Sequence, residues 1–266
     1  MWPCPGDVNA SHAMSSLTRM LSVLDLFTPD HPAWTAEEIA QHLDCSLPTA
    51  YRYLRELSDV QLLRTASTGR YVLGTKIIEL DFQLRAADPL IQAGHGPMKE
   101  LARQVDCDVA LVTLSGTHLL TVHYEASHAE MRASYGRGRR MPTFKGAMSL
   151  ALLSSLGKPQ LRKLYQTNAQ EAAATPGAQS LDALGESLKS IRKQGYAVSQ
   201  GALDAQNAGI AIALLIPEHD IVASLGLVLS AERLRLLETD KAAEWLRQCA
   251  QHIDHHLKSP PVRYAA

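Results

Sequence analysis

Hydrophobic residues recur at helical spacing in two short runs between Thr35 and Leu57, and a polar turn, Asp44-Cys45, separates the runs. Along the first run, one helical face collects Ala36, Ile39, Ala40 and Leu43. Along the second run, one face collects Ala50, Tyr53, Leu54 and Leu57. The pattern predicts two amphipathic helices joined by a tight turn, which is the arrangement of a helix-turn-helix.

Polar residues at the start of each run support these helix boundaries. Thr35 and Glu38 have the spacing of a capping box, in which each side chain bonds to the backbone amide of the other residue. Ser46 is a suitable N-cap for the second helix. Pro48 falls in the first turn of that helix, where no helical hydrogen bond is lost.

The second helix leaves a polar outward face, which carries Thr49, Arg52 and Arg55 with Tyr51 to one side. A helix that reads the major groove needs such side chains. Hydroxyl groups bond to phosphates and bases, and arginine bonds to phosphate or to guanine O6 and N7. We therefore expect this face, together with Ser46, to contact duplex DNA.

The flanking segments predict a larger unit around the two helices. An upstream amphipathic helix that would cover them is indicated by Leu17, Met20, Leu21, Leu24 and Phe27. Downstream, residues 62–64 and 71–73 have the pattern of two strands around a turn centred on Gly69. Helix, helix-turn-helix and β-wing together predict a winged helix-turn-helix domain.

The charge of this segment argues against strong non-specific DNA binding. Residues 1–76 contain fewer Lys and Arg than Asp and Glu, whereas DNA-binding domains are usually basic. Only the expected binding edge is basic, and Arg70 of the wing is a further candidate for DNA contact there. Asp30, Glu37 and Glu38 are expected to face away, and dimeric binding is then needed for useful affinity. The alternative is a small helical domain that binds no DNA.

The composition is that of an ordinary globular protein. The chain has 266 residues, 46% of them hydrophobic, and a net charge of −1, which suggests two domains. Its four cysteines are far apart in the sequence: Cys4, Cys45, Cys107 and Cys249. No CxxC pair exists, so we expect neither a disulfide framework nor a zinc ribbon, and a reducing compartment is the simplest inference.

The first residues lack the basic and apolar segments of a signal peptide, and Met14 is an alternative start. The longest apolar runs, such as residues 209–216, are too short to cross a bilayer. We therefore expect a cytoplasmic protein that contacts no membrane.

The rest of the chain mixes helical and strand patterns. Helices are expected over residues 75–87, 88–105, 144–156, 158–166, 181–194 and 231–257. Strands are expected over 108–114, 118–124, 131–135, 196–199, 209–216 and 221–229, and a loop over 168–180. Helices packed on a mostly antiparallel sheet make an α+β domain. The expected organisation is a disordered extension (1–14), a winged helix-turn-helix domain (15–74), a linker helix (75–87), a second domain (88–258) and a tail (259–266).

Several stretches resemble the IclR family of bacterial transcriptional regulators, over roughly residues 16 to 257. The stretches are LTRMLSVLDLF, LPTAYRYL, TGRYVLGTKIIEL, GRGRRMPTFKGAMSLALL, SIRKQGYAVS, GIAIALLIP and LGLVLS. The resemblance implies a GAF-like effector-binding domain behind the winged helix-turn-helix. It also implies dimers or tetramers that bind near-palindromic operators, and effectors that are small organic or aromatic acids. No cofactor is expected.

The resemblance also assigns residues to functions. Thr49 and Arg52 match the family's recognition motif, although Pro48 replaces the usual serine, and Arg19 matches an arginine of the family's first helix. The positions that correspond to the effector pocket are one wall at Met141, Gly146, Ala147 and Met148, an entering strand with Ala133, and a floor of Ile210, Ile212, Leu227 and Leu229.

The nature of the effector is suggested by Leu227 and Leu229, which stand where members that bind small hydrophilic acids offer serines. A buried leucine contributes about 1.5–3 kcal/mol of apolar transfer but cannot satisfy a carboxylate. We therefore expect a larger, more apolar effector such as an aromatic acid, with its charged end at the backbone amides of residues 146–148. The alternative is that these leucines only fill the core.

Three weaker candidates have ordinary structural alternatives. Asp204 precedes a strand at the expected pocket rim, where it would bond an effector hydroxyl or cap its own loop. His118 and His123 face opposite sides of a regular strand and cannot converge on a metal without a bend, and His128 continues the same spacing, so no metal site is expected. The basic run at residues 137–140 is expected to be a solvated turn.

No enzyme motif is present, since the sequence lacks GxSxG, HExxH, P-loop and GxGxxG patterns. A hydrolase would need catalytic residues that are distant in the sequence. A third interpretation is an interaction scaffold that binds no DNA. We favour a DNA-binding regulator of a catabolic operon under the control of a small-molecule effector.

Overall fold

The computed structural model describes residues 15–66, 69–127 and 135–258, and the chain divides into two compact units, Met1–Ala87 and Asp88–Ala266. The expected extension at residues 1–14, the tail at 259–266 and most of the expected strand at 131–135 lie outside the described residues.

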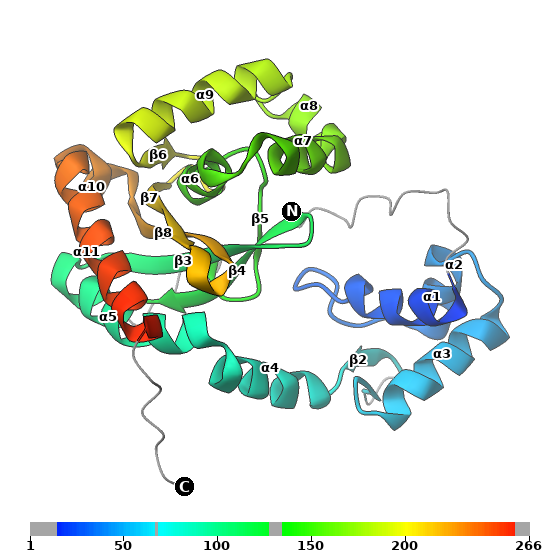
Figure 1. Cartoon of the computed structure of the whole chain (residues 1–266). Helices are drawn as coiled ribbons and strands as arrows, with labels where there is room; N and C mark the ends of the chain where they lie inside the picture. The colour runs from blue at the N-terminus through cyan, green and yellow to red at the C-terminus, as the bar shows by residue number, and fades with distance from the viewer. Residues whose placement is uncertain (1–14, 67–68, 128–134, 259–266) are drawn as a thin grey trace, which may run out of the picture. The chain divides into compact units, whose positions relative to one another are not determined.

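The described part of the first unit contains three α-helices and a 3-10 segment, followed by a two-stranded sheet and a final helix (Figure 1). In chain order these are α1 (Ser16–Ser22), η1 (Val23–Leu26), α2 (Ala36–His42), α3 (Leu47–Asp59), β1 (Leu63–Thr65), β2 (Tyr71–Leu73) and α4 (Lys76–Ala87). The predicted helix-turn-helix, wing and linker helix are therefore confirmed.

The capping box fixes the start of α2. Thr35 Oγ1 accepts a hydrogen bond from the Glu38 amide at 3.2 Å, and the Thr35 amide donates to Glu38 Oε2 at 2.7 Å. The predicted stripe of α3 is buried in the core of this unit, with Leu54 and Leu57 almost fully enclosed. Ser46 holds the N-cap position of α3, but its side chain bonds to Thr49 rather than to a helix amide.

The upstream helix differs from the prediction. Leu17 and Leu21 were expected to cover the helix pair, but they are 70% and 52% exposed. Val23 and Leu26 are buried in their place. Met20, Leu24 and Phe27 pack against the core as expected. From Val23 the chain continues as a 3-10 segment with about three residues per turn, so Val23 and Leu26 lie on the same side of it.

The second unit is built on one antiparallel sheet with the strand order β5-β4-β3-β8-β7-β6. The strands are β3 (Asp108–Ser115), β4 (His118–Glu125), β5 (Arg140–Met141), β6 (Ala197–Gln200), β7 (Asn207–Ile216) and β8 (Ile221–Ser230). The predicted hairpin of the two long strands is confirmed, and it turns through η3 (Pro217–His219).

Helices cover both faces of this sheet (Figure 1). On one face, here called the α5–α11 face, lie α5 (Pro89–Val105) and α11 (Thr239–Lys258). On the other, the α6–α9 face, lie α6 (Ala147–Ser155) and α9 (Leu181–Gln194), with α7 (Lys158–Thr167) beside them. Each face has its own apolar core, so neighbouring residues on a strand belong to different cores.

Three expected elements of the second unit need correction. The expected loop at residues 168–180 contains a short helix, α8 (Ala169–Ala174). The expected final helix is two helices, α10 (Ala231–Leu236) and α11, because the backbone turns extended at Leu237. The expected solvated turn at residues 137–140 is tied to the sheet, since Arg137 donates to the Val122 carbonyl and Arg140 belongs to β5.

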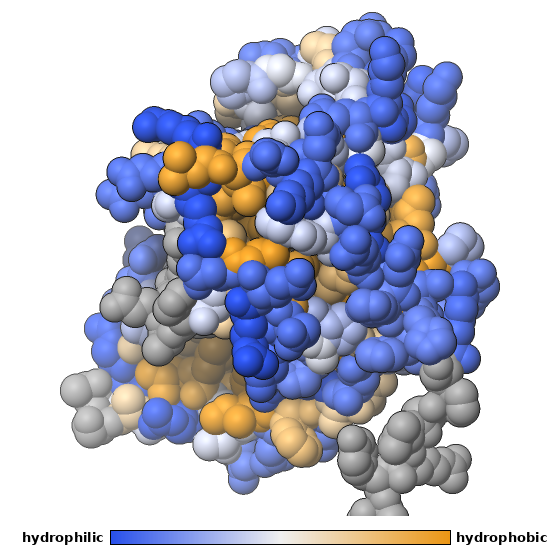
Figure 2. Space-filling view, turned by 90° about the vertical axis from the view of Figure 1, so that its left-hand side faces the viewer, coloured by the Kyte–Doolittle hydropathy of each residue, from blue (hydrophilic) through white to orange (hydrophobic). Residues whose placement is uncertain are grey.

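The surface in Figure 2 is mostly hydrophilic (blue), and hydrophobic residues (orange) show between the hydrophilic ones. The large aliphatic side chains of the three apolar cores are buried beneath the surface. Among the described helices, none has the length and apolar character needed to cross a membrane.

Candidate functional site

The outward face of α3 carries the side chains that were predicted to contact DNA. Tyr51, Arg52 and Arg55 are exposed and Thr49 is half-buried. The Arg52 guanidinium lies 5.6 Å from the centre of the Tyr53 ring, a cation–π contact that leaves its donors available. Arg55 lies 3.8 Å from Asp59, a weak exposed pair that a phosphate would readily replace.

Glu37 does not face away from this edge as expected. The Tyr51 hydroxyl donates to Glu37 Oε1 at 3.4 Å, so the carboxylate lies beside the predicted binding face. The negative charge of Glu37 raises the pKa of Tyr51, which therefore stays protonated as a hydrogen-bond donor. A carboxylate at this place disfavours a neighbouring phosphate, which agrees with modest non-specific affinity.

Arg70 of the wing is already engaged within the unit. Its guanidinium lies 2.8 Å from Glu38 Oε2 and donates to the Ala33 carbonyl at 3.1 Å. The pKa of Glu38 is lowered by the hydrogen bond from the Thr35 amide and by Arg70. Arg70 therefore ties the wing to α2, and its side chain remains 37% exposed, so its predicted contact with DNA stays a prediction. Arg19 is half-buried in the last turn of α1, and its predicted contact with DNA stays a prediction.

The residues assigned to the effector pocket do not come together. Met141, Ala147 and Met148 lie in the core of the α6–α9 face. The expected floor lies in the core of the α5–α11 face: Ile210, Ile212, Leu227 and Leu229. Because alternate residues of a strand point to opposite faces, a shift of one position moves each of these side chains to the other core. Ala133 lies outside the described residues.

The α6–α9 face carries residues that the sequence analysis missed. Thr121 pairs with Val112 across β4 and β3, and Val112 pairs with Ser224 across β3 and β8, so the three side chains share one row on this face. The hydroxyls of Thr121 and Ser224 are fully buried and have no hydrogen-bond partner among the described residues. The alternation along β8 was the signal that could have found Ser224.

The start of α6 lies on the same face of the sheet. Gly146 has φ +91°, a conformation that favours glycine, and it is the N-cap of the helix. The Ala147 amide donates to Ser199 Oγ of β6 at 2.8 Å. One of the backbone amides that was expected to receive the effector carboxylate is therefore occupied by the protein itself.

Asp204 caps its own loop. Its Oδ1 accepts from the Gln206 amide at 3.1 Å, and its Oδ2 accepts from Asn207 Nδ2 at 3.1 Å. Both carboxylate oxygens therefore have partners in the loop, which favours the alternative that was weighed against effector binding.

Among the histidines, His123 does meet other potential metal ligands. It lies near Glu125 of its own strand and His95 of α5, a combination that the sequence spacing did not indicate. His128 lies outside the described residues. His95 could not be linked to His123 from the sequence, because strand β4 begins more than twenty residues after His95.

These features define a class: a transcriptional regulator with an N-terminal winged helix-turn-helix and a C-terminal α+β unit. The family descriptions that match are the "IclR helix-turn-helix domain" over residues 16–67 and "Bacterial transcriptional regulator IclR C-terminal" over residues 84–255. The chain belongs to the IclR family, and the resemblance noted in the sequence is confirmed.

Known relatives match along most of the chain. The HTH-type transcriptional regulator XynR of Escherichia coli is 26% identical over 251 residues, which cover 93% of this chain and 98% of XynR. The members of these families are regulators, so the hydrolase alternative is set aside.

Two solved structures share the fold. An IclR family regulator from Brucella abortus has a TM-score of 0.77 at 19% identity and covers 92% of this chain and 93% of its own. An IclR homologue from Microbacterium hydrocarbonoxydans, complexed with 4-hydroxybenzoate, has a TM-score of 0.74 at 24% identity. The match covers 92% of this chain and 100% of the homologue.

Proposed function

We propose that this regulator binds operator DNA through the outward face of α3. The observation that carries the proposal is the division of that helix into a buried apolar stripe and an exposed face with Tyr51, Arg52 and Arg55. Because Arg70 is held by Glu38, these residues with Thr49 and Ser46 supply most of the contacts. Operator DNA is chromosomal, so the protein works in the cytoplasm.

We further propose that the protein acts as a homodimer or a tetramer of such dimers. Large apolar side chains of the first unit are exposed on α1 and α4: Leu17, Leu21, Ile78, Leu80, Phe82 and Leu84. No residue of α4 is buried, although half of the helix is apolar. A second copy that covers these side chains would remove apolar surface from water and present two recognition helices to successive major grooves.

The effector site is proposed on the α6–α9 face, around Thr121 and Ser224. A buried hydroxyl without a partner costs about 1–3 kcal/mol, and a ligand that supplies the partner recovers that free energy. The surroundings are apolar, with Val112, Val228 and Met148 in the same core. Leu227 and Leu229 face the other core, so they do not contribute to the apolar character of this site.

An aromatic acid fits this region best. Apolar side chains favour a ring. The two hydroxyls can donate hydrogen bonds to a carboxylate, and they can donate to a phenol group or accept from it. The relative bound to 4-hydroxybenzoate supports the same class of effector. An effector that prefers one conformation by about 1–3 kcal/mol would be enough to control operator affinity. Genes for the breakdown of such an acid are the expected target.

Two experiments test the proposal separately. Selection of duplexes from a random pool by the purified full chain should enrich a near-palindrome, and no enrichment would contradict DNA recognition. Thermal unfolding with benzoate and 4-hydroxybenzoate should show saturable stabilisation. Stabilisation by pyruvate but by neither aromatic acid would contradict the proposed effector class and leave DNA recognition standing.

A further inference from the structure

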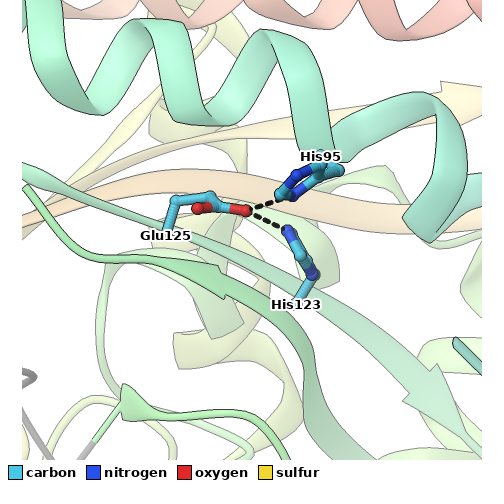
Figure 3. A group of neighbouring side chains, drawn as sticks. All are labelled: His95, His123 and Glu125. Carbon is cyan, nitrogen blue, oxygen red and sulfur yellow. Dashed lines mark hydrogen bonds and ion pairs between the residues drawn. The ribbon is translucent and has the colours of Figure 1, made fainter. Parts of the chain in front are cut away.

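Three potential metal ligands meet on the α5–α11 side of the second unit, away from the proposed effector site. His95 comes from α5, and His123 and Glu125 come from β4 (Figure 3). His95 Nδ1 lies 2.6 Å and His123 Nε2 lies 2.7 Å from the same oxygen, Glu125 Oε1. All three ligand atoms lie within 4.8 Å of one another.

A β-bulge creates this arrangement. His123 pairs with Leu111 and Thr121 pairs with Val112, so Val122 is an extra residue in β4. The bulge reverses the alternation along the strand, and His123 therefore points to the same side as Leu111, whose side chain lies in the core of the α5–α11 face. Without this bulge His123 would point to the same side as Thr121, away from the α5–α11 face.

We propose that His95, His123 and Glu125 bind a divalent transition-metal ion, and that Zn²⁺ is the ion the site fits best. Two imidazole nitrogens and one carboxylate oxygen form a common protein ligand set for Zn²⁺, with water in the remaining position. Mg²⁺ and Ca²⁺ prefer sites made of oxygen ligands only, so the two histidines disfavour them.

The geometry needs only a small adjustment to accept the ion. Zn²⁺ bonds of about 2.0–2.2 Å place tetrahedral ligand atoms roughly 3.3 Å apart. The two pairs at 2.6 Å and 2.7 Å must therefore open by less than about 1 Å. The side chain of His95 is 58% exposed and has room to move, whereas His123 and Glu125 are 12% and 15% exposed and form a fixed base.

The site joins two elements that pack on each other but are distant in the sequence. A metal ion held by α5 and β4 would crosslink the helix to the sheet and stabilise the folded second unit. This inference depends neither on the proposed DNA contacts nor on the proposed effector.

The test is a calorimetric titration of Zn²⁺ into the tag-free full chain after treatment with a chelator. We expect one ion per chain and a rise in the thermal unfolding temperature. Mutation of residues that only hydrogen-bond to metal ligands typically weakens metal binding about 10–100-fold. Loss of a ligand itself, in His95→Ala or His123→Ala, should therefore weaken Zn²⁺ binding by at least about tenfold. His252→Ala is the control, because His252 is exposed on α11 outside the cluster and its loss should change nothing.

Saturable binding with unchanged affinity in His95→Ala would overturn the assignment, as would no saturable binding by the natural chain. His95→Ala should still fold, because His95 is exposed and Glu125 keeps its contact with His123, so this variant decides the question if His123→Ala fails to fold. Co²⁺ is a second probe, because a nitrogen–oxygen site of low coordination number gives it visible absorption that His95→Ala should abolish.

Discussion

Met148 of α6 lies directly over Gly226 of β8, so close that a Cβ on the glycine would be 2.9 Å from Met148 Cγ. The same Cβ would be 3.0 Å from the Cβ of Ala211 on the neighbouring strand. The missing side chain at Gly226 therefore sets how closely α6 packs on the sheet.

Gly226→Ala should destabilise the second unit by about 1–3 kcal/mol, because the added methyl group overpacks a tight contact. Denaturant unfolding followed by circular dichroism measures this. Gly185→Ala is the matched control, since Gly185 lies inside α9 with nothing within 4 Å of its added Cβ. That variant should gain about 0.5–1 kcal/mol. Equal stability of Gly226→Ala and the natural chain would contradict the tight packing.

Ser224→Ala should weaken binding of an aromatic effector without lowering stability in its absence, because the hydroxyl has no partner among the described residues. Ser149→Ala is the contrast, since the equally buried Ser149 hydroxyl donates to the Pro142 carbonyl at 2.5 Å. Its loss should cost about 1–3 kcal/mol. Calorimetry and thermal unfolding separate the two effects, and unchanged effector affinity in Ser224→Ala would remove that residue from the site.

The elements set by local chemistry could be predicted from the sequence, and those set by strand register could not. The capping box of Thr35 and Glu38, the stripe of α3 and the hairpin of β7 and β8 follow from residues close together in the chain. The side of the sheet that each residue of β7 and β8 faces depends on the register in which the strands pair. The expected wall and floor of the effector pocket were consequently assigned to one site, although they lie on opposite sides of the sheet.

The metal cluster shows the same limit more sharply. The alternation rule put His118 and His123 on opposite faces, but the bulge at Val122 breaks that rule. Nothing local in the sequence marks the extra residue, and His95 reaches the strand only through helix packing. Arg70 is a similar case, because its partner Glu38 is distant in the chain although close in the folded unit.

The stability of the first unit should depend on pH through Glu38. Its pKa lies below the ordinary 4.5 because the Thr35 amide and Arg70 stabilise the carboxylate. A carboxyl with a lowered folded-state pKa contributes stability that is complete above the unfolded value and is lost as the pH falls through the folded value. The natural chain should therefore be more stable than Glu38→Gln at neutral pH, and that advantage should be lost as the pH falls below the ordinary value of 4.5 and through the lower folded-state value.

Thermal unfolding of both proteins between about pH 7 and pH 3 measures this difference. Arg70→Gln should show a smaller change than Glu38→Gln, since it removes the ion pair and leaves the Thr35 hydrogen bond. A constant difference between the natural chain and Glu38→Gln across the range would contradict the role assigned to the carboxylate.

Two buried thiols should resist alkylation in the native protein. Burial raises the pKa of the Cys249 thiol to about 12 and also raises that of Cys107. The reactive species is the thiolate, so both should react with iodoacetamide only after unfolding. Cys45, half-buried in the turn of the helix-turn-helix, should react faster. Mass spectrometry of peptides reports each site, and rapid native labelling of Cys249 would contradict the packing of α11.

The most direct test of the central claim is the affinity of Arg52→Ala for a selected operator, measured over a series of salt concentrations. The account predicts a loss of about 1–3 kcal/mol in specific binding, with a smaller salt dependence if Arg52 contacts a phosphate. Arg162→Ala is the control, because Arg162 is exposed on α7 of the second unit and should bind DNA like the natural chain. Natural affinity in a folded Arg52→Ala protein, and likewise in Thr49→Ala, would contradict the assignment of α3 as the recognition helix.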